Sequence, residues 1–379
     1  MQKIPSCWMS ALRAIPVALA VSAALLVLAA PVSAQESSYK IFGDVKAAFG
    51  QYSYSEDDGT DTLSLNNYDT ALESNIRIRN ANFDKDTMYF EIRLRFRGVE
   101  GGNEDSNTLT SKDTFADSGV QTARIYAGWN VTEQFAIEIG RTGGISAAFS
   151  DLELIETGDL LGTPAGAFDA SDTGSINAIF KVNPDIKVGL VVLSSCQPGC
   201  AGDDDDGGQA QFGNGTIMPH FEGTFGPIAV AARLASATGS WEENESPTGE
   251  AETVASSGTG LAVAYDQDGI YVGFDYESYK LGCIGDDCEE VSGQIIGIGF
   301  DVANIYGHYA THAISNAGGV KSDTENATVL LVGYAFKMGN GTVAPEYLSG
   351  SEVFTPDATG ADEETKTASE IRLAYKVKF

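Results

Sequence analysis

The sequence predicts an all-β fold, a 16-stranded antiparallel β-barrel. Three observations predict it. After residue 35, sixteen runs alternate between polar and apolar residues with a period of two, which is the spacing of the two faces of a strand. The breaks between these runs alternate between short and long. In several runs, arginines share one face while Ile, Leu and Phe share the other.

The first five runs precede the longest break in the chain. In the first run, Ile41 and Phe49 share one face, and Lys40 and Lys46 share the other. Polar residues or turn formers follow each run, as they do at the ends of strands. The five runs cover residues 39–54, 72–83, 88–97, 122–131 and 134–140.

Eleven further runs follow that break and reach the end of the chain. The last of them places Ile371, Leu373 and Tyr375 on one face. Because each run fits a strand that is apolar on one side, we expect all of them to join one sheet. These runs cover residues 175–182, 186–194, 216–225, 228–241, 258–266, 270–280, 293–303, 305–314, 327–338, 343–354 and 369–379.

The alternation of the breaks separates two classes of β protein. The short breaks are residues 84–87, 132–133, 183–185, 226–227, 267–269, 304 and 339–342. The long breaks are residues 55–71, 98–121, 141–172, 195–215, 242–257, 281–292, 315–326 and 355–368. A soluble sandwich gives no reason for this pattern, whereas outer-membrane barrels have short periplasmic turns and long external loops. We therefore expect a transmembrane barrel whose arginine face lines the lumen.

Charge and the N-terminal segment set further limits. A net charge of −30 argues against nucleic acid as a partner. Lys3 and Arg13 flank the start of an apolar stretch over residues 15–28, and Val32-Ser33-Ala34 resembles a cleavage site. These features predict a cleaved signal peptide over residues 1–34 and a barrel domain over residues 35–379.

Four cysteines remain outside the predicted signal peptide, in two close pairs. The pairs are Cys196 with Cys200 and Cys283 with Cys288. Exported proteins form disulfides, and the close spacing favours two local staples among the three possible connectivities. The alternative is a metal site, which fits less well because these spacings are not those of zinc sites and no histidine lies beside them.

The sequence shows no catalytic set, so we expect no enzyme activity. The three histidines are His220, His308 and His312. Four residues of strand separate the last two by about 13 Å, too far to share a metal ion. A Ser–His–Asp triad stays open as an alternative, because triads are spatial arrangements. We expect no cofactor and no metal.

The chain end and the arrangement of runs resemble a known family. The final strand, with Tyr375, Val377 and Phe379 on one face, resembles the signal read by the outer-membrane assembly machinery. Together with YKIFGDVKAAFGQY and TVAPEYLSG, it makes residues 35–379 resemble the general porins of Gram-negative bacteria. The resemblance implies outer-membrane lipid and lipopolysaccharide as surroundings. It also implies a homotrimer with the early and last strands as its contact wall.

The resemblance also implies a pore constriction. In that family the third external loop folds back into the barrel, and residues 141–172 occupy this place. The acids implied at the constriction are Asp151, Glu153, Glu156 and Asp159. The basic wall implied opposite them consists of Arg77, Arg79, Arg93, Arg95, Arg97 and Arg124. The period of two gives the face of each arginine but not its depth in the pore.

These features predict a channel for passive diffusion of small hydrophilic solutes and ions, with a preference for cations. Two alternatives remain. A substrate-specific channel would carry a ladder of aromatic side chains along the lumen, and a structural or adhesive barrel would be plugged. The acidic runs in the long breaks fit either weak divalent-cation binding or simple solvation.

Overall fold

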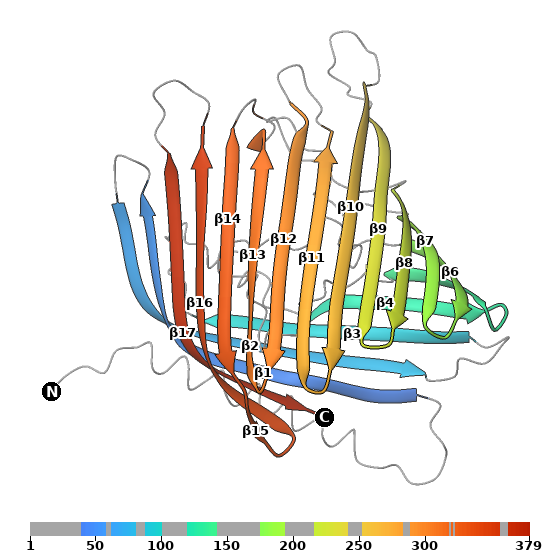
Figure 1. Cartoon of the computed structure of the whole chain (residues 1–379), viewed down its shortest axis with the longest axis horizontal. Coiled ribbons are helices and arrows are strands. Elements are labelled where there is room, and N and C mark those ends of the chain that lie inside the picture. Colours follow the sequence, from blue (N-terminus) through green and yellow to red (C-terminus); the bar gives the residue numbers. More distant parts are fainter. Residues whose placement is uncertain are drawn as a thin grey trace.

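Seventeen strand segments form one antiparallel sheet in this computed structural model (Figure 1). The structure describes residues 39–57, 62–80, 88–100, 120–141, 175–193, 216–241, 252–282, 289–317, 320, 323–356 and 363–379. The strands are β1 (Tyr39–Asp57), β2 (Thr62–Asn80), β3 (Met88–Glu100), β4 (Val120–Asn130), β5 (Phe135–Arg141), β6 (Ser175–Asn183), β7 (Ile186–Leu193), β8 (Ile217–Phe225), β9 (Ile228–Trp241), β10 (Glu252–Gln267), β11 (Ile270–Leu281), β12 (Val291–Val302), β13 (Ile305–Ser315), β14 (Thr324–Tyr334), β15 (Phe336–Met338), β16 (Gly341–Thr355) and β17 (Glu364–Lys378). Among these residues, no helix is long and apolar enough to cross a membrane.

The sheet closes on itself, and its seventeen segments make sixteen strands. β1 pairs with β2 on one side and with β17 on the other. β14 and β15 both pair with β16 in one continuous register, from Thr324 opposite Thr355 to Met338 opposite Gly341. They are therefore a single strand interrupted at Ala335. This confirms the predicted 16-stranded antiparallel barrel.

The C-terminus takes part in the closure. Gly43 and Phe379 exchange two backbone hydrogen bonds, of 3.0 and 3.1 Å. The side chain of Asn340 also donates to the carbonyl of Lys378, at 3.2 Å. Figure 1 shows the C-terminus at the end of the barrel that carries the short turns. The last residue thus completes the ring by pairing with the first strand.

Tight turns join the strands at this end, as the sequence predicts. Asp268 and Gly269 have positive φ values of 55° and 77°, and Ala303 and Asn304 have 53° and 69°. Two-residue hairpins favour such values because their twist then matches the twist of the strands. Gly226 adopts the left-handed region for the same reason, with φ of 63°.

The structure corrects one predicted break. Residues 55–71 were expected to form a long loop, but β1 continues to Asp57 and β2 begins at Thr62. Here the backbone ladder continues, with Ser55 opposite Ser64. The polar–apolar alternation stops because this stretch has no apolar surroundings to face, whereas backbone pairing needs no particular side chains. β10 and β17 likewise begin several residues before their alternating runs.

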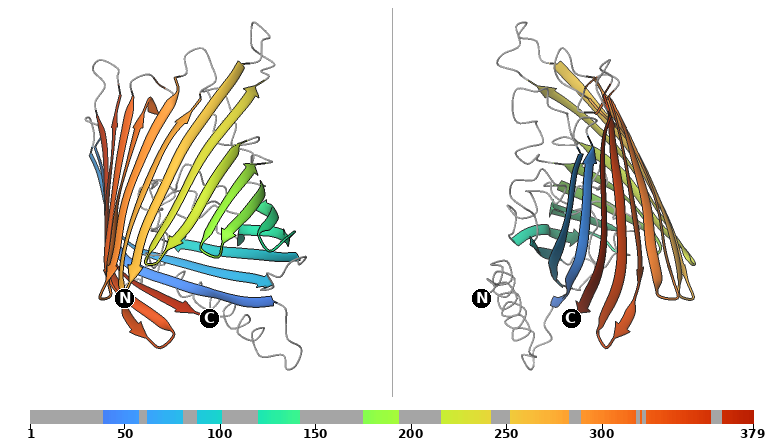
Figure 2. Two further views of the ribbon diagram at one scale, coloured as in Figure 1. Left: turned by 45° about the vertical axis from the view of Figure 1, so that its right-hand side comes forward. Right: turned by 90° about the vertical axis from the view of Figure 1, so that its left-hand side faces the viewer.

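The height of the wall varies around the barrel. β5 to β8 contain seven, nine, eight and nine residues, whereas β1 and β2 contain nineteen each. Figure 2 shows this difference between the long strands and the short ones near β6 and β7. Large apolar side chains line the outer face, among them Phe49 and Ile371, which are 58% and 68% exposed.

Candidate functional site: the inner wall

The inner face is identified by side chains that reach across a whole strand. Tyr89 on β3 donates to Glu138 Oε1 on β5 at 2.9 Å, passing over β4. Tyr279 on β11 lies 2.7 Å from His312 Nε2 on β13, passing over β12. Side chains two strands apart converge only on the concave side of a closed sheet. These residues therefore face the interior of the barrel.

Each crossing side chain lies over a glycine of the intervening strand. A Cβ added to Gly128 would collide with the ring of Tyr89, and one added to Gly293 would collide with Tyr279. At Gly260 an added Cβ would lie 2.9 Å from Arg233 Nε. Gly189 and Gly333 lie under His220 and Tyr306 in the same way. The glycines let long polar side chains lie flat on the wall.

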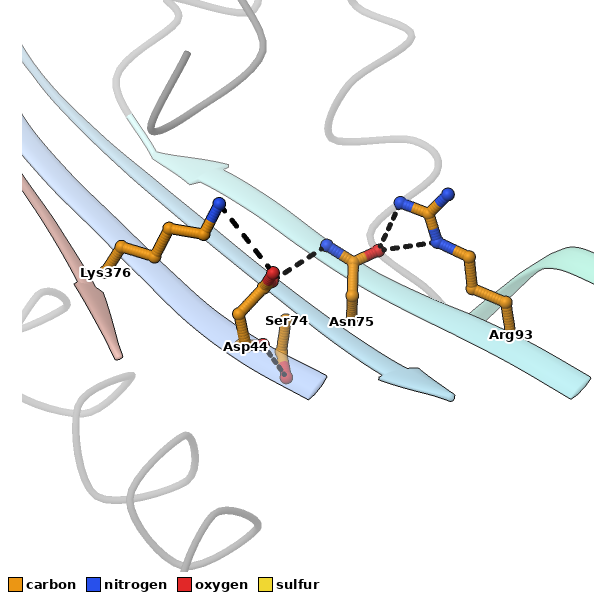
Figure 3. A network of polar contacts seen from close by, with 5 residues as sticks. All are labelled: Asp44, Ser74, Asn75, Arg93 and Lys376. Carbon is orange, nitrogen blue, oxygen red and sulfur yellow. Dashed lines mark hydrogen bonds and ion pairs between the residues drawn. The ribbon is translucent and has the colours of Figure 1, made fainter. Parts of the chain in front are cut away.

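A polar network joins four neighbouring strands of this face (Figure 3). Lys376 Nζ on β17 lies 3.9 Å from Asp44 Oδ2 on β1. Asn75 on β2 donates from Nδ2 to Asp44 Oδ1 at 3.1 Å. Arg93 on β3 donates from Nε and Nη2 to Asn75 Oδ1 at 3.3 and 3.2 Å. From the opposite face of β2, the Ser74 hydroxyl donates to the backbone carbonyl of Asp44 at 3.3 Å.

The register places the predicted basic wall in one block. Arg77 pairs with Arg93, and Arg93 pairs with Arg124, so three arginines form one row across β2, β3 and β4. Arg95 lies opposite Asn75, and Arg97 lies opposite Glu73. Like charges directly opposite each other destabilise a sheet. The side chains of Arg95, Arg97 and Arg124 lie outside the described part of the structure.

Besides Arg93, two arginines of the block have described side chains, and they differ in exposure. Arg77 is half-buried and Arg79 is exposed. The Arg79 guanidinium lies 5.2 Å from the centre of the Phe42 ring. This distance fits a cation–π contact, so Arg79 is held against the wall by an aromatic ring on β1.

Several carboxylates of the inner wall are paired with arginines. Glu346 accepts a hydrogen bond from Arg372 Nε at 2.6 Å and a second from the Tyr306 hydroxyl. Glu346 is 2% exposed and Arg372 is 5% exposed, so this pair is buried. Arg233 and Glu277 form a similar pair on β9 and β11. Losing one partner of such a pair would leave an uncompensated buried charge.

A second group of acids lies at the loop end of the wall and was missed by the sequence reasoning. Glu325, Glu352 and Glu364 lie on inward positions of β14, β16 and β17. Lys366 contacts Glu364 at 2.6 Å and Glu352 at 3.6 Å. A signal for them exists in the sequence, because they alternate with Ser and Thr just beyond the apolar parts of their strands.

Other predicted site residues fall outside the described residues. These are the loop acids Asp151, Glu153, Glu156 and Asp159, and the cysteines Cys196, Cys200, Cys283 and Cys288. The predicted signal peptide, residues 1–34, also falls outside them. Their predicted roles therefore stay predictions.

The predicted assembly signal lies on the closing strand. Tyr375 and Phe379 are 45% and 40% exposed on the outer face. Val377 is half-buried opposite Val45 of β1. The three residues thus border the seam of the barrel, and their recognition by the assembly machinery stays a prediction.

The three histidines all lie on the inner face, with different neighbours. His220 lies 3.2 Å from Asn177 Oδ1, and His312 contacts Tyr279. His308 is 7% exposed on β13. Within the described residues, no group of three or more His, Cys, Asp or Glu is placed to hold a metal ion.

The sequence of this chain, which forms a closed barrel with an apolar outer face and a polar inner face, matches a protein-family model. The model is described as Gram-negative porin, and it matches residues 18–378. This chain belongs to the Gram-negative porin family. No curated protein sequence matches this porin. Family and fold together place the porin in the outer membrane as a channel-forming barrel.

Solved structures share the fold at low sequence identity. The outer membrane channel DcaP of Acinetobacter baumannii has a TM-score of 0.57 and 12% identity, covering 90% of this porin and 97% of that chain. An anion-selective porin from Comamonas acidovorans has a TM-score of 0.54 and 14% identity, covering 91% of this porin and 100% of that chain. OmpT of Vibrio cholerae has a TM-score of 0.53 and 13% identity, covering 91% of this porin and 99% of that chain. At these identities the likeness concerns the fold alone.

Proposed function

We propose that this porin is a passive diffusion channel for small hydrophilic solutes and ions that prefers cations. The observation that supports this proposal is the separation of charged and uncharged side chains between the two faces of the sheet. Carboxylates gather on the inner face at the loop end, while the outer face of the same strands is apolar or uncharged. A channel mouth lined by one sign of charge concentrates ions of the opposite sign.

The mouth carboxylates exceed their local counter-charge. Glu352 and Glu364 share one lysine, Lys366, in their ion pairs, and Glu325 lies on the neighbouring strand β14. The net charge of −30 adds a field of the same sign over the whole chain. Cations would therefore be enriched where they enter from the external side.

The constriction is the second part of the proposal. We expect the acids Asp151, Glu153, Glu156 and Asp159 to lie opposite the arginine row on β2 to β4. Acids on one side and arginines on the other would set a transverse field across the water path. Such a field orients dipolar solutes and disfavours apolar ones. The contiguous register of Arg77, Arg93 and Arg124 supports this arrangement.

The inner tyrosines favour a general channel over a substrate-specific one. A specific channel would offer free aromatic faces along its path. In the described residues, Tyr89, Tyr279 and Tyr306 are each 7% exposed or less, and each hydroxyl has a partner on the wall. These rings lie flat over glycines and link strands that do not pair directly. Little of their surface is therefore left for a solute to stack on.

The assembly is also part of the proposal. We propose a homotrimer in which the early and last strands meet the neighbouring copies. One related structure, of OmpT from Vibrio cholerae, is described as a trimer form. We further expect the assembly machinery of the outer membrane to read the C-terminal strand. We propose no catalytic role.

The zero-current potential of the purified porin in a planar bilayer under a salt gradient tests the proposal. We expect an ohmic conductance with a potential of the sign for cation preference. The triple variant E325Q/E352Q/E364Q removes the mouth charges and is expected to lower that preference. Neutralising the four loop acids is expected to lower it further. The variant E133Q, on an exposed turn at the other end, serves as the control.

Each outcome separates the alternatives. Absence of conductance would mean a plugged barrel. A preference for anions would leave the channel intact but assign its selectivity to the arginine row. An unchanged potential in both sets of acid variants would refute the proposed role of the acids.

A further inference from the structure

One basic side chain lies among the mouth acids. Lys366 Nζ on β17 lies 2.6 Å from Glu364 Oε1 and 3.6 Å from Glu352 Oε1. Glu56 of β1 is the direct cross-strand partner of Lys366 on its other side. Glu325 of β14 is a diagonal neighbour of Glu352, because the register sets Glu352 opposite the residue two places after it. Lys366 and these four glutamates are here called the Lys366 cluster.

The side chains of the cluster point into the lumen. The strands β1, β17, β16 and β14 are consecutive in the sheet and stand side by side in Figure 1. Glu352 lies an even number of residues from Glu346 on β16, and Lys366 lies an even number from Arg372 on β17. Glu346 and Arg372 belong to the inner wall, and residues an even number apart share one face of a strand. The cluster therefore faces the interior at the loop end of the barrel.

The row of residues directly below the cluster carries no charge. Each member is the cross-strand partner of the next, and the row consists of Tyr54, Ala368, Gly350 and Val329. Tyr54, Ala368 and Val329 are 2%, 3% and 3% exposed. The Tyr54 hydroxyl donates to Glu56 Oε2 at 2.8 Å, so it holds this carboxylate at the cluster. From this row to the loop end, Lys366 is the only basic residue among the described inward side chains of the four strands.

The ammonium group lies where carboxylates could otherwise hold a metal ion. Ca²⁺ takes about six to eight oxygen ligands, and carboxylates are the charged groups that supply them. Within the described residues, no three acidic or histidine groups converge on a metal position, and here the ammonium group lies between the glutamates. It fills part of the space that a metal ion would need. Its charge also opposes the binding of a second cation at the same oxygens.

We propose that Lys366 is a selectivity-determining residue of the channel, because its ammonium group takes the place of a divalent cation in the mouth. This proposal rests on the proposed function as a cation-preferring channel. An ion must bind well enough to enter a channel and weakly enough to leave it. Without the lysine, the four carboxylates would retain a divalent cation and so slow the ions behind it. With the lysine, the mouth keeps an excess of negative charge that attracts monovalent cations and lets them pass.

The test removes the charge of Lys366 and adds Ca²⁺. K366Q and K366M both remove the charge, so the test does not depend on the folding of one variant, and K366R keeps the charge. K280Q is the matched control, since Lys280 forms an exposed ion pair of 2.7 Å with Glu290 at the same end of the barrel. Calorimetry follows the titration of CaCl₂ into each purified porin in detergent. Planar bilayers of neutral phosphatidylcholine report the effect of Ca²⁺ on the K⁺ conductance.

We expect K366Q and K366M to bind Ca²⁺ roughly ten-fold more tightly than wild type, because the ion no longer competes with a positive charge at the same oxygens. Over the same concentrations, Ca²⁺ is expected to lower the K⁺ conductance of both variants. Wild type, K366R and K280Q are expected to bind Ca²⁺ weakly and to conduct K⁺ equally with and without it. K366Q/E352Q is expected to lose the gain in affinity, since it lacks one of the ligands.

Four outcomes would overturn the proposal. Wild-type affinity in both K366Q and K366M would show that the lysine takes the place of no cation. An equal gain in K280Q or K366R would show that the charge at this position is not the cause. A gain retained in K366Q/E352Q would exclude Glu352 as a ligand. Tight binding without any effect on the K⁺ conductance would place the site off the ion path.

The two readouts separate this proposal from the proposed function. If the porin conducted but preferred anions, the proposed cation preference would be refuted, whereas tighter Ca²⁺ binding by K366Q would still show that the lysine takes the place of a cation. If the porin preferred cations and K366Q bound Ca²⁺ no better than wild type, only the role of Lys366 would be refuted.

Discussion

Glycines on the inner wall let neighbouring side chains lie flat. Gly128, Gly260 and Gly293 each sit beneath a long side chain that reaches the next strand but one. A glycine in a strand costs conformational entropy and weakens pairing. Here that cost is offset by a hydrogen bond that links strands which do not pair directly. The long side chains can lie across these strands because the glycines beneath them have no side chain.

The variant G293A tests this role at the residue scale. Its added methyl group would collide with the Tyr279 ring, and overpacking of this kind costs about 1–3 kcal/mol. We expect a lower unfolding temperature in heat-modifiability gels.

The double variant Y279A/G293A is the control. With the ring removed, G293A is expected to cost much less, so the two effects would not be additive. Additive effects would show that the ring and the glycine act independently.

The closing strand, β17, has one pairing partner close in the sequence and one far away. β17 pairs with β16, its neighbour in the chain, and with β1, more than 300 residues away. Phe379 adds two backbone bonds to Gly43 at the seam. Closure therefore depends on the most distant contact in the chain, and such contacts form late because of loop entropy.

Deleting Phe379 is expected to slow folding into lipid vesicles, because it removes both bonds to Gly43. F379A keeps the backbone bonds and removes only the ring, so it separates the effect of the ring from that of the bonds. F336A, on an exposed aromatic of β15, is the matched control. Folding rates are followed by the gel shift of the barrel. If the deletion folded at the wild-type rate, the seam bonds would not limit closure.

The whole molecule separates its charges between two faces and along its inner wall. Among the described residues, the outer face carries mainly apolar and hydroxyl side chains, while the inner face carries most of the charged side chains. On that inner face, the arginine row lies on β2 to β4, and the mouth acids lie on β14, β16 and β17. Ion selectivity is therefore expected to reflect a balance of two opposed groups.

The variant R77Q/R93Q tests that balance. Removing two charges of the row is expected to raise cation preference in the zero-current potential. The effect is expected to fall between 0.1 and 1 M salt, because the screening length falls from about 10 to about 3 Å. K337Q, on the exposed β15, is the control. A shift of the potential toward anions would refute the assignment of the row to the pore.

The number of strands, the faces of their side chains and the rim of short turns could be predicted from the sequence. Each depends on local features, namely the period of two and turn residues such as Asp268-Gly269. The same local reasoning failed at residues 55–71, because strand pairing continues there without alternation. It also failed to find Glu325 and Glu352, because their alternation with Ser and Thr gives their face, whereas their grouping at one end of the barrel depends on how β14 and β16 are aligned.

Register and closure were decided only by the tertiary structure. Period two puts Arg77, Arg93 and Arg124 on one face, but only pairing between strands places them in one row. The pairing of Ser55 with Thr367 is equally invisible along the chain, because the two residues come from β1 and β17. Side-chain direction follows from the backbone of each strand, whereas depth and neighbourhood follow from which strands meet and how they are aligned.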